Sequence, residues 1–250
     1  MIEVHNLTFG YSATEDRQIL KGVDFAAKTG KLTALIGTNG AGKSTLLKTI
    51  MGILKGKGEI SVNGKPVSQY STKDFSSTVS YLSQDNDCKV NLSVFEVVML
   101  GRMGSMSFRV SDEDIAATQE VLERLNLQGF ASRSIMELSG GQRQLVFMAQ
   151  ALVKEPKILI LDEPTSALDL HKQFDLLTLL KNLTQENDFT TLVTLHHLDL
   201  AAMFADEIIV LKEGTVYAQG APKDIFTEAM MEDVYRVKTK IYMDDNGLPH

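Results

Sequence analysis

Short apolar runs and longer stretches of helical period alternate along the chain. Runs rich in Val, Ile, Leu and Phe, punctuated by glycine, predict strands at 2–9, 19–27, 32–36, 58–62 and 79–82. After Pro156, apolar runs return at 158–161, 190–195 and 207–211, with a helical stretch between each. Continuous apolar strands that alternate with helices are typical of a parallel sheet covered on both faces. The pattern therefore predicts an α/β core.

Between Ser93 and about Val153 the apolar positions follow a helical period instead. Two capping signals begin helices there, because Ser93 precedes Glu96, and Ser111 precedes Asp114, by three residues. The second helix is expected to bury one face and to end at Gly129. The residues of that face are Ile115, Thr118, Leu122 and Leu125. We read the helical block as an insertion into the α/β core.

Composition and charge narrow the class of protein. The chain has 250 residues, 44% of them hydrophobic and 23% charged, which is the balance of a globular protein. Its formal net charge of -7 argues against nucleic acid as the main partner. Cys88 is the only cysteine and cannot form an internal disulfide, and the N-terminal residues do not resemble a signal peptide. The apolar run 158–161, like every other apolar run of the sequence, is far too short to cross a bilayer. We expect a cytosolic chain that leaves any membrane crossing to another subunit.

The first candidate for chemistry is "GTNGAGKST" at 37–45, which we call the phosphate turn. It matches G-x-x-x-x-G-K-[ST], follows an apolar strand and leads into a helix with Leu46, Leu47 and Ile50. Glycines let backbone N–H groups point at phosphate oxygens, where the helix dipole adds positive potential. Lys43 is expected to neutralise the β and γ phosphates, and the Ser44 hydroxyl to bind Mg²⁺. The alternative is an ordinary turn between a strand and a helix.

A second candidate is the acidic pair Asp162 and Glu163. The pair ends the apolar strand 158–161, and ligands of such folds bind at the carboxyl ends of parallel strands. Asp162 is expected to hold Mg²⁺, and Glu163 to orient or deprotonate the water that attacks the γ phosphate. The alternative is a solvated turn before Pro164.

A third candidate is the sequence "LSGGQ" at 138–142, which we call the LSGGQ turn. A match to five specified residues is not expected by chance in a chain of this length. A Ser-Gly-Gly segment would also cap the helix that follows, whose Leu145, Met148, Ala149 and Leu152 face one way. The two readings are compatible, because a helix N-terminus with two glycines is itself an anion site.

In this order and spacing, "GTNGAGKST", "LSGGQ" and "ILILDEPTSALD" resemble the nucleotide-binding subunit of ATP-binding cassette (ABC) transporters over essentially the whole chain. The resemblance implies a P-loop NTPase core with a parallel sheet, an N-terminal antiparallel β subdomain and an inserted helical subdomain. It implies one nucleotide-binding domain over 1–250, with 1–83 and 154–250 forming the core and β subdomain and 84–153 the helical subdomain.

The resemblance also implies a role for individual residues. Glu163, His196 and Gln84 take catalytic roles, with His196 as the switch that senses the γ phosphate; the neighbouring His197 is the alternative. Mg²⁺ is held by Ser44, Gln84 and Asp162. Tyr11 stacks on adenine, and Asp169 belongs to a loop through which two cassettes touch. The full set expected to bind ATP is Tyr11, Gly37, Asn39, Gly40, Ala41, Gly42, Lys43, Ser44, Thr45, Ser139, Gly140, Gly141, Gln142 and Asp169.

The partners and the place in the cell follow from the same resemblance. Two cassettes form a homodimer in which each ATP lies between the phosphate turn of one and the LSGGQ turn of the other. The dimer binds separate transmembrane permease subunits at the cytoplasmic side of the membrane, and serves an extracytoplasmic substrate-binding protein indirectly. Residues 84–110 are the region expected to receive the permease.

Three alternatives for the function differ in class. A bare cassette favours import, and "VVMLGRMG", "LHHLDLAAMFAD" and the tail "VYRVKTKIYMDDNGLP" resemble the group that imports ferric siderophores, haem, cobalamin or molybdate. A cassette of an exporter with separate membrane subunits is the second alternative. A soluble ABC ATPase acting on nucleic acid or the ribosome is the third, and the acidic charge argues against it.

Overall fold

The computed structural model of the chain describes residues 1–11, 18–84, 91–102, 110–245 and 247–250. The chain forms two compact units, each with its own core. We call Met1–Tyr70 with Phe174–His250 the sheet unit, and Ser71–Gln173 the helical unit. The proposed division into 1–83 with 154–250 and 84–153 stays a prediction. Cys88 lies outside the described residues.

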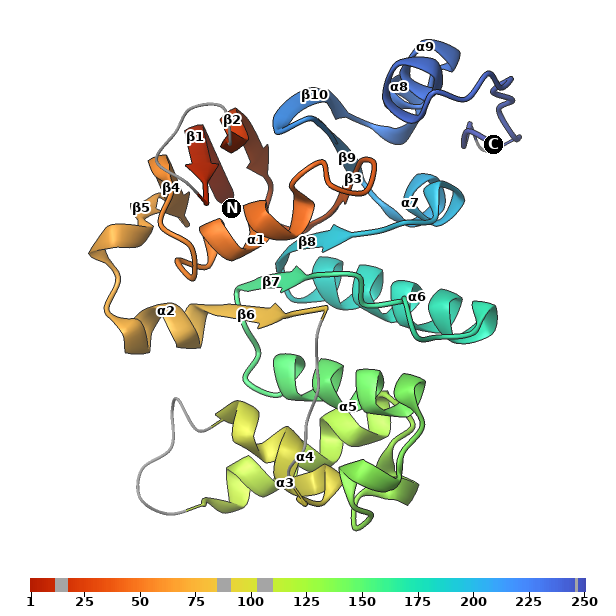
Figure 1. The fold of residues 1–250 in the computed structure, drawn as a ribbon. Helices are drawn as coiled ribbons and strands as arrows, with labels where there is room; N and C mark the ends of the chain where they lie inside the picture. Colours follow the sequence, from red (N-terminus) through yellow and green to blue (C-terminus); the bar gives the residue numbers. More distant parts are fainter. Residues whose placement is uncertain (12–17, 85–90, 103–109, 246) are drawn as a thin grey trace. The chain divides into compact units, whose positions relative to one another are not determined.

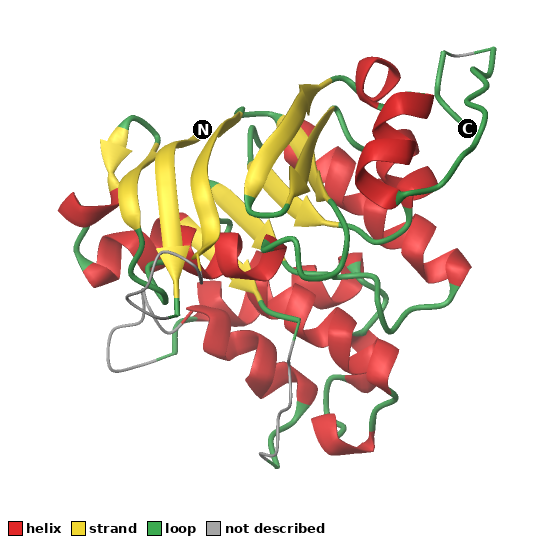
Figure 2. Ribbon diagram, turned by 45° about the horizontal axis from the view of Figure 1, so that its top comes forward, coloured by secondary structure: helices red, strands yellow, loops and turns green. Residues whose placement is uncertain are grey.

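The sheet unit contains an antiparallel sheet near the N-terminus. Its strands are β1 (Ile2–Gly10), β2 (Gln18–Ala27), β4 (Lys57–Val62) and β5 (Lys65–Pro66), in the order β2-β1-β4-β5. Figure 2 shows these strands side by side. The pairs β1–β2, β1–β4 and β4–β5 are all antiparallel, which confirms the expected antiparallel subdomain.

The second set of strands in the sheet unit is largely parallel. β3 (Lys31–Ile36) pairs in parallel with β8 (Thr190–Thr194) and with β9 (Glu207–Lys212), and β10 (Thr215–Gly220) is antiparallel to β9. Every residue of β8 is buried, as are all of β3 after Lys31, so these strands are covered on both faces. The parallel α/β core predicted from the apolar runs is confirmed.

Helices follow the parallel strands. In the sheet unit, α1 (Lys43–Ile50) follows β3, α7 (Leu198–Phe204) follows β8, and α8 (Pro222–Ile225) and α9 (Glu228–Met230) follow β10 (Figure 1). The residues of α6 (Leu170–Glu186) begin in the helical unit and end in the sheet unit. A buried strand thus delivers the chain to a helix N-terminus at the phosphate turn.

The helical unit contains several α-helices and a parallel strand pair. Its elements are α2 (Thr72–Thr78), β6 (Val79–Leu82), α3 (Val94–Met99), α4 (Asp112–Arg124), α5 (Gly140–Leu152) and β7 (Ile158–Leu161). α3 packs on both α4 and α5, and β6 pairs in parallel with β7. The capping boxes predicted at Ser93 with Glu96, and at Ser111 with Asp114, are both present and confirmed.

Two expectations about α4 were wrong. The helix ends at Arg124 and not at Gly129, because Asn126 adopts a left-handed φ of 55°. The amide of Leu127 then donates to the carbonyl of Leu122 at 2.7 Å, which closes a Schellman turn. In addition, Ile115 is 36% exposed, whereas Thr118, Leu122 and Leu125 of the same predicted face are buried.

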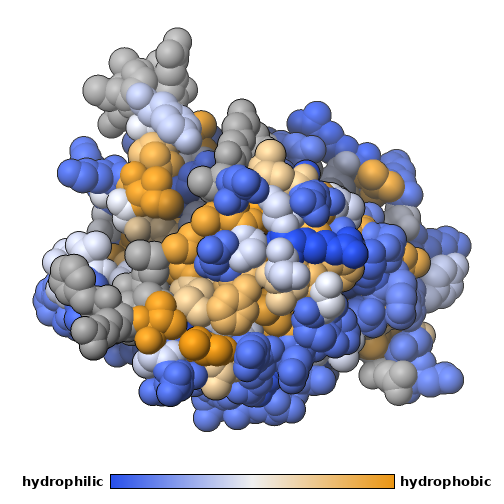
Figure 3. Space-filling model, turned by 90° about the horizontal axis from the view of Figure 1, so that it is seen from below, coloured by the Kyte–Doolittle hydropathy of each residue, from blue (hydrophilic) through white to orange (hydrophobic). Residues whose placement is uncertain are grey.

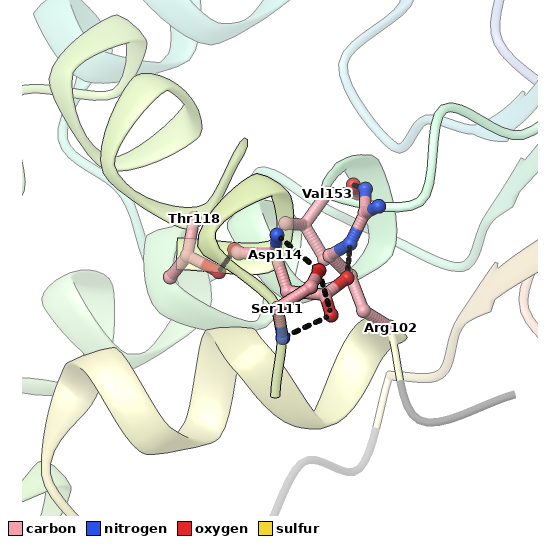
Figure 4. Close-up of polar contacts among 5 residues, drawn as sticks. All are labelled: Arg102, Ser111, Asp114, Thr118 and Val153. Carbon is pink, nitrogen blue, oxygen red and sulfur yellow. Dashed lines mark hydrogen bonds and ion pairs between the residues drawn. The ribbon is translucent and has the colours of Figure 1, made fainter. Parts of the chain in front are cut away.

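Polar contacts also hold the helical unit together (Figure 4). Arg102, just beyond α3, forms an ion pair with Asp114 on α4 and donates to the carbonyl of Val153 beyond α5 at 3.1 Å. The Ser111 hydroxyl donates to the same carboxylate at 2.7 Å. Because Ser111 and Arg102 both donate to it, the pKa of Asp114 falls to about 2. One carboxylate therefore serves as helix cap and as a link between helices.

Apolar residues gather on one face of the molecule, surrounded by hydrophilic ones (Figure 3). The helical unit exposes several large apolar side chains, namely Leu100, Val110, Ile115 and Met136. No helix within the described ranges is both long and apolar enough to span a membrane.

Candidate functional site

The phosphate turn connects β3 to α1 in a conformation that only glycine accommodates. Gly37 has φ of 148°, and a Cβ there would lie 2.2 Å from the carbonyl oxygen of Leu211. Gly42, which precedes α1, has φ of 104°, a region that side chains rarely adopt. Among the described residues, no side chain caps the first turn of α1. Its amides are therefore directed to the turn itself, where an anion would meet them.

Lys43 closes the phosphate turn from the inside. Its side chain is only 6% exposed, and its ammonium donates to the carbonyls of Gly37 at 2.7 Å and Thr38 at 3.2 Å. These two bonds hold the ammonium at the inner side of the turn. The turn therefore fits a polyphosphate: glycines bring the backbone close, and a lysine supplies the charge.

The remaining residues predicted in the turn surround Lys43. Ser44 and Thr45 are half-buried in the first turn of α1, Ala41 is buried, and Asn39 and Gly40 are exposed. His196 belongs to the same sheet edge, because β3 and β8 are parallel neighbours with Leu35 opposite Thr194. The histidine follows β8 by two residues and is exposed, and His197 is the cap residue before α7. The sheet unit thus brings the phosphate turn and His196 to one edge.

Tyr11 lies just beyond β1. Its side chain is 70% exposed, and its ring meets that of Phe9 edge to face, with centroids 5.0 Å apart. An exposed ring held by a neighbouring aromatic residue offers a free face for stacking. The expected contact with adenine stays a prediction.

In the helical unit, Asp162 and Glu163 follow β7. They are 2% and 9% exposed, and the amide of Asp162 donates to Leu82 at 2.8 Å, which extends the pairing of β7 with β6. Glu163 has φ of 52°, a left-handed conformation that is uncommon for a residue other than glycine. Gln84, two residues beyond β6, donates from Nε2 to Glu163 Oε2 at 2.7 Å. Two residues that the sequence placed in the catalytic group are therefore in contact.

The LSGGQ turn is both a cap and an exposed surface. Ser139 caps α5: its hydroxyl accepts from the amide of Gln142 at 3.3 Å, and the Gln142 side chain accepts from the amide of Ser139 at 2.9 Å. Ser139 and Gly140 are exposed. A Cβ on Gly141 would lie 2.9 Å from the carbonyl oxygen of Ala167, so this glycine allows close contact with the segment after Glu163.

Asp169 begins α6. Its carboxylate accepts from the amide of Lys172 at 3.0 Å and lies 3.3 Å from the Lys172 ammonium. The backbone hydrogen bond from Lys172 lowers the pKa of Asp169. Asp169 is exposed, and its contact with a second cassette stays a prediction.

Gln144 also contacts Glu163, and sequence reasoning missed it. Its amide group donates to the carbonyl oxygen of Glu163 at 3.0 Å and accepts from the amide of Ala167 at 3.1 Å. It lies two residues beyond the LSGGQ turn, within the sequence "GGQRQ", and no spacing rule connects it to residues about twenty positions away. The contact depends on tertiary packing of α5 against the segment after β7.

Comparison with known proteins agrees with the geometry. The family model described as ABC transporter matches residues 20–166. The iron(3+)-hydroxamate import ATP-binding protein of Bacillus subtilis (strain 168) is 37% identical over 246 residues, which cover 97% of this chain and 90% of that protein.

Two solved structures are also similar. One is described as a metal-chelate type ABC transporter in an inward-facing conformation; it has a TM-score of 0.83 and 28% identity, and covers 100% of this chain and 97% of that one. The other is a dimeric ATP-binding cassette in a post-hydrolysis state bound to ADP and phosphate, with a TM-score of 0.80, 30% identity and coverage of 88% and 98%.

Proposed function

Because the chain belongs to the ABC transporter family, as one of its ATP-binding and ATP-hydrolysing subunits, we propose that it powers the import of a metal chelate, with iron–siderophore complexes as the first candidates. Support for this cargo comes from the relative named for iron(3+)-hydroxamate import and from the neighbour described as a metal-chelate type transporter. The phosphate turn carries the proposal of ATP use, because its glycines let backbone amides approach phosphate and its buried Lys43 supplies positive charge.

The proposed roles begin at the phosphate turn. The amides of the turn, from Gly37 through Thr45 and including Asn39, Gly40 and Ala41, bind the phosphate oxygens of ATP, and Lys43 neutralises their charge. Tyr11 stacks on the adenine ring. His196, at the same sheet edge as the turn, donates to the γ phosphate.

Glu163 is the proposed general base or water-orienting residue. Its burial and its hydrogen bond with Gln84 hold the carboxylate in one position, as an attacking water requires. When bound, Mg²⁺ draws negative charge from the phosphates. Ser44, Asp162 and Gln84 offer the oxygen ligands that this ion prefers. In the described part of the chain, no three His, Cys, Asp or Glu residues gather as a metal site.

We further propose that two copies of the chain work as a homodimer. Ser139, Gly140, Gly141 and Gln142 then bind the ATP held by the phosphate turn of the other copy, with Asp169 at the interface. The dimeric state of the similar cassette supports this assembly. The exposure of Ser139 and Gly140 leaves the LSGGQ turn accessible to a partner.

The proposed membrane partner is a separate permease. Residues 84–110 of the helical unit receive it, and the exposed Leu100 lies within this stretch. The chain would then act at the cytoplasmic face of the membrane and serve an extracytoplasmic substrate-binding protein indirectly. We include no nucleic acid among the partners, because the net charge is -7.

Transport in vesicles tests the cargo. The chain and a candidate permease are placed in lipid vesicles, and uptake of a radioactive ferric hydroxamate is followed with a candidate binding protein present. We expect uptake that requires ATP and that ceases with Glu163→Gln, a variant that still binds ATP. Outward transport driven by ATP would contradict import, and full turnover by Glu163→Gln would remove Glu163 from its role.

A further inference from the structure

The segment from Glu163 to Leu168 is held by side chains of two helices. The Glu163 carbonyl accepts from Gln144 Nε2 at 3.0 Å and from the Ser166 hydroxyl at 3.1 Å. From α6, the buried Gln173 donates to the carbonyls of Thr165 at 3.2 Å and Leu168 at 2.9 Å. Of these two glutamines, Gln144 is the one that bonds to Glu163 itself.

Gln144 uses both ends of its amide on this segment. While its Nε2 donates to Glu163, its Oε1 accepts from the amide of Ala167 at 3.1 Å. The pair of bonds spans the turn that follows β7, so the side chain acts as a brace between the two ends of that turn. A flexible side chain whose two polar atoms are both hydrogen-bonded loses its rotamer freedom, so it holds its bonding partners at fixed positions relative to one another.

The brace connects Glu163 to the LSGGQ turn. Gly141 lies three residues before Gln144 on the same face of α5, and its absent side chain lets Ala167 approach, with only 2.9 Å between a Cβ there and the Ala167 carbonyl oxygen. The first two turns of α5 therefore pack on the segment 163–167. This contact joins the LSGGQ turn to the segment that begins at Glu163.

Glu163 needs such support because of its backbone. Its φ of 52° is strained for a residue with a side chain and persists only when its surroundings hold it. Gln84 bonds to the carboxylate of Glu163, whereas Gln144 bonds to its main chain. The side-chain amides of Gln84 and Gln144 thus fix the carboxylate and the main chain of Glu163.

We propose that Gln144 is a positioning residue for ATP hydrolysis, which holds the main chain of Glu163 and couples its position to the LSGGQ turn at the start of α5. The inference rests on the proposed role of Glu163. It assigns Gln144 no contact with nucleotide. Its loss should therefore lower the rate of the chemical step and leave the binding of ATP unchanged.

Matched variants separate this role from general stability. Gln144→Leu removes both hydrogen bonds, and Gln144→Glu keeps an acceptor for the Ala167 amide but loses the donor to Glu163. The control is Gln150→Leu: Gln150 lies on the same helix and donates to the carbonyl of Val97 at 3.0 Å, away from Glu163. Gln144 and Gln150 are both half-buried, so the two Leu variants change similar surroundings.

Amide hydrogen exchange of the nucleotide-free chain is the first readout. Exchange across 163–169 should accelerate in Gln144→Leu, because the Ala167 amide loses its acceptor. It should stay near the wild-type rate in Gln144→Glu and in Gln150→Leu. Equal exchange in Gln144→Leu and wild type would overturn the brace.

Steady-state hydrolysis is the second readout. For Gln144→Leu and Gln144→Glu we expect kcat to fall about 10- to 100-fold with KM for ATP within about twofold of wild type. Gln150→Leu should keep its kcat.

The outcomes distinguish the inference from the function on which it rests. If Glu163→Gln abolishes turnover while Gln144→Leu matches Gln150→Leu in kcat, the positioning role is overturned and the proposed function stands. The positioning role is also overturned if Gln144→Leu raises KM as much as it lowers kcat. The same holds if Gln144→Leu is so much less thermally stable than Gln150→Leu that unfolding explains its lower rate. If Glu163→Gln turns over at the wild-type rate, the proposed role of Glu163 fails, and hydrogen exchange alone decides whether the brace exists.

Discussion

The two glycine-rich turns of the molecule precede helices in different ways. Before α1, Gly42 is left-handed with φ of 104°, and no described side chain caps the helix. Before α5, Ser139 has an extended conformation with φ of -64°, and its capping box with Gln142 satisfies amides of the first turn. The phosphate turn also buries a lysine, Lys43, whereas Ser139 and Gly140 of the LSGGQ turn are exposed.

The difference shows how each turn would meet a ligand. The phosphate turn offers uncapped amides and a buried positive charge, so it fits a polyphosphate by itself. The LSGGQ turn has bonded part of its polar groups internally and presents an exposed edge. Such an edge suits a ligand that is already held by another surface. The two turns are therefore complementary halves and not duplicates.

The largest difference between the two turns is expected in the binding of nucleotide by the single chain. Lys43→Ala should weaken ATP binding about 100-fold, because it removes charge-assisted bonds to phosphate. Ser139→Arg should change the affinity of the single chain by less than about threefold, since its turn acts only in the dimer. Titration with ATP at protein concentrations below those of dimer formation measures both. Equal losses would contradict the division of roles.

Alanine substitution at the two glycines of the LSGGQ turn should affect the free energy of unfolding differently, because Gly141 is packed and Gly140 is exposed. A Cβ on Gly141 would press on the Ala167 carbonyl at 2.9 Å, whereas nothing lies within 4 Å of a Cβ on Gly140. Gly141→Ala should therefore destabilise the chain by about 1–3 kcal/mol. Gly140→Ala should be neutral or stabilise it by up to about 1 kcal/mol through helix propensity. Urea unfolding measures both, and a similar loss in each would show that α5 does not pack on the segment after β7.

Acid should affect the capping boxes of α4 and α5 differently. The cap of α4 contains the charged Asp114, with a pKa lowered to about 2 by Ser111 and Arg102, and the cap of α5 contains the neutral Gln142. A carboxyl whose folded pKa lies below its unfolded value of about 4 contributes stability above that value. This contribution is lost as the pH falls from about 4 to about 2.

Two variants measure the difference. The difference in urea unfolding midpoint between wild type and Asp114→Asn should become smaller as the pH falls from about 4 to about 2. The corresponding difference between wild type and Gln142→Ala should stay constant. A constant gap for Asp114→Asn would show that its charge does not contribute to folding.

Local signals in the sequence predicted the elements well. The strands at 158–161 and 79–82 were recognised because they are uninterrupted apolar runs, and β6 and β7 have the predicted bounds. β10 was not, because "TVYAQG" alternates half-buried with exposed positions and has few apolar residues. The end of α4 was misplaced because Asn126, and not the nearby Gly129, adopts the left-handed conformation.

In the candidate site, too, the contiguous parts were predictable from the sequence and the long-range contacts were not. The phosphate turn is contiguous, so its glycines and Lys43 can be read directly from the sequence. The contact between Gln84 and Glu163 joins residues 79 positions apart; Glu163 was identified from its place at the end of an apolar strand, and Gln84 by resemblance to a family. Gln144 was missed because its bonds to Glu163 and Ala167 depend on how α5 packs on the chain after β7. Sequence spacing carries no trace of such packing.

The central claim is that the LSGGQ turn completes the site of a second copy. Mixing Lys43→Ala chains with Ser139→Arg chains tests it most directly, because each variant damages a different half and one intact composite site remains in the mixed dimer. We predict that neither variant alone forms dimers with ATP, and that the mixture recovers both ATP-dependent pairing and hydrolysis. A mixture that neither pairs nor hydrolyses ATP would contradict the claim.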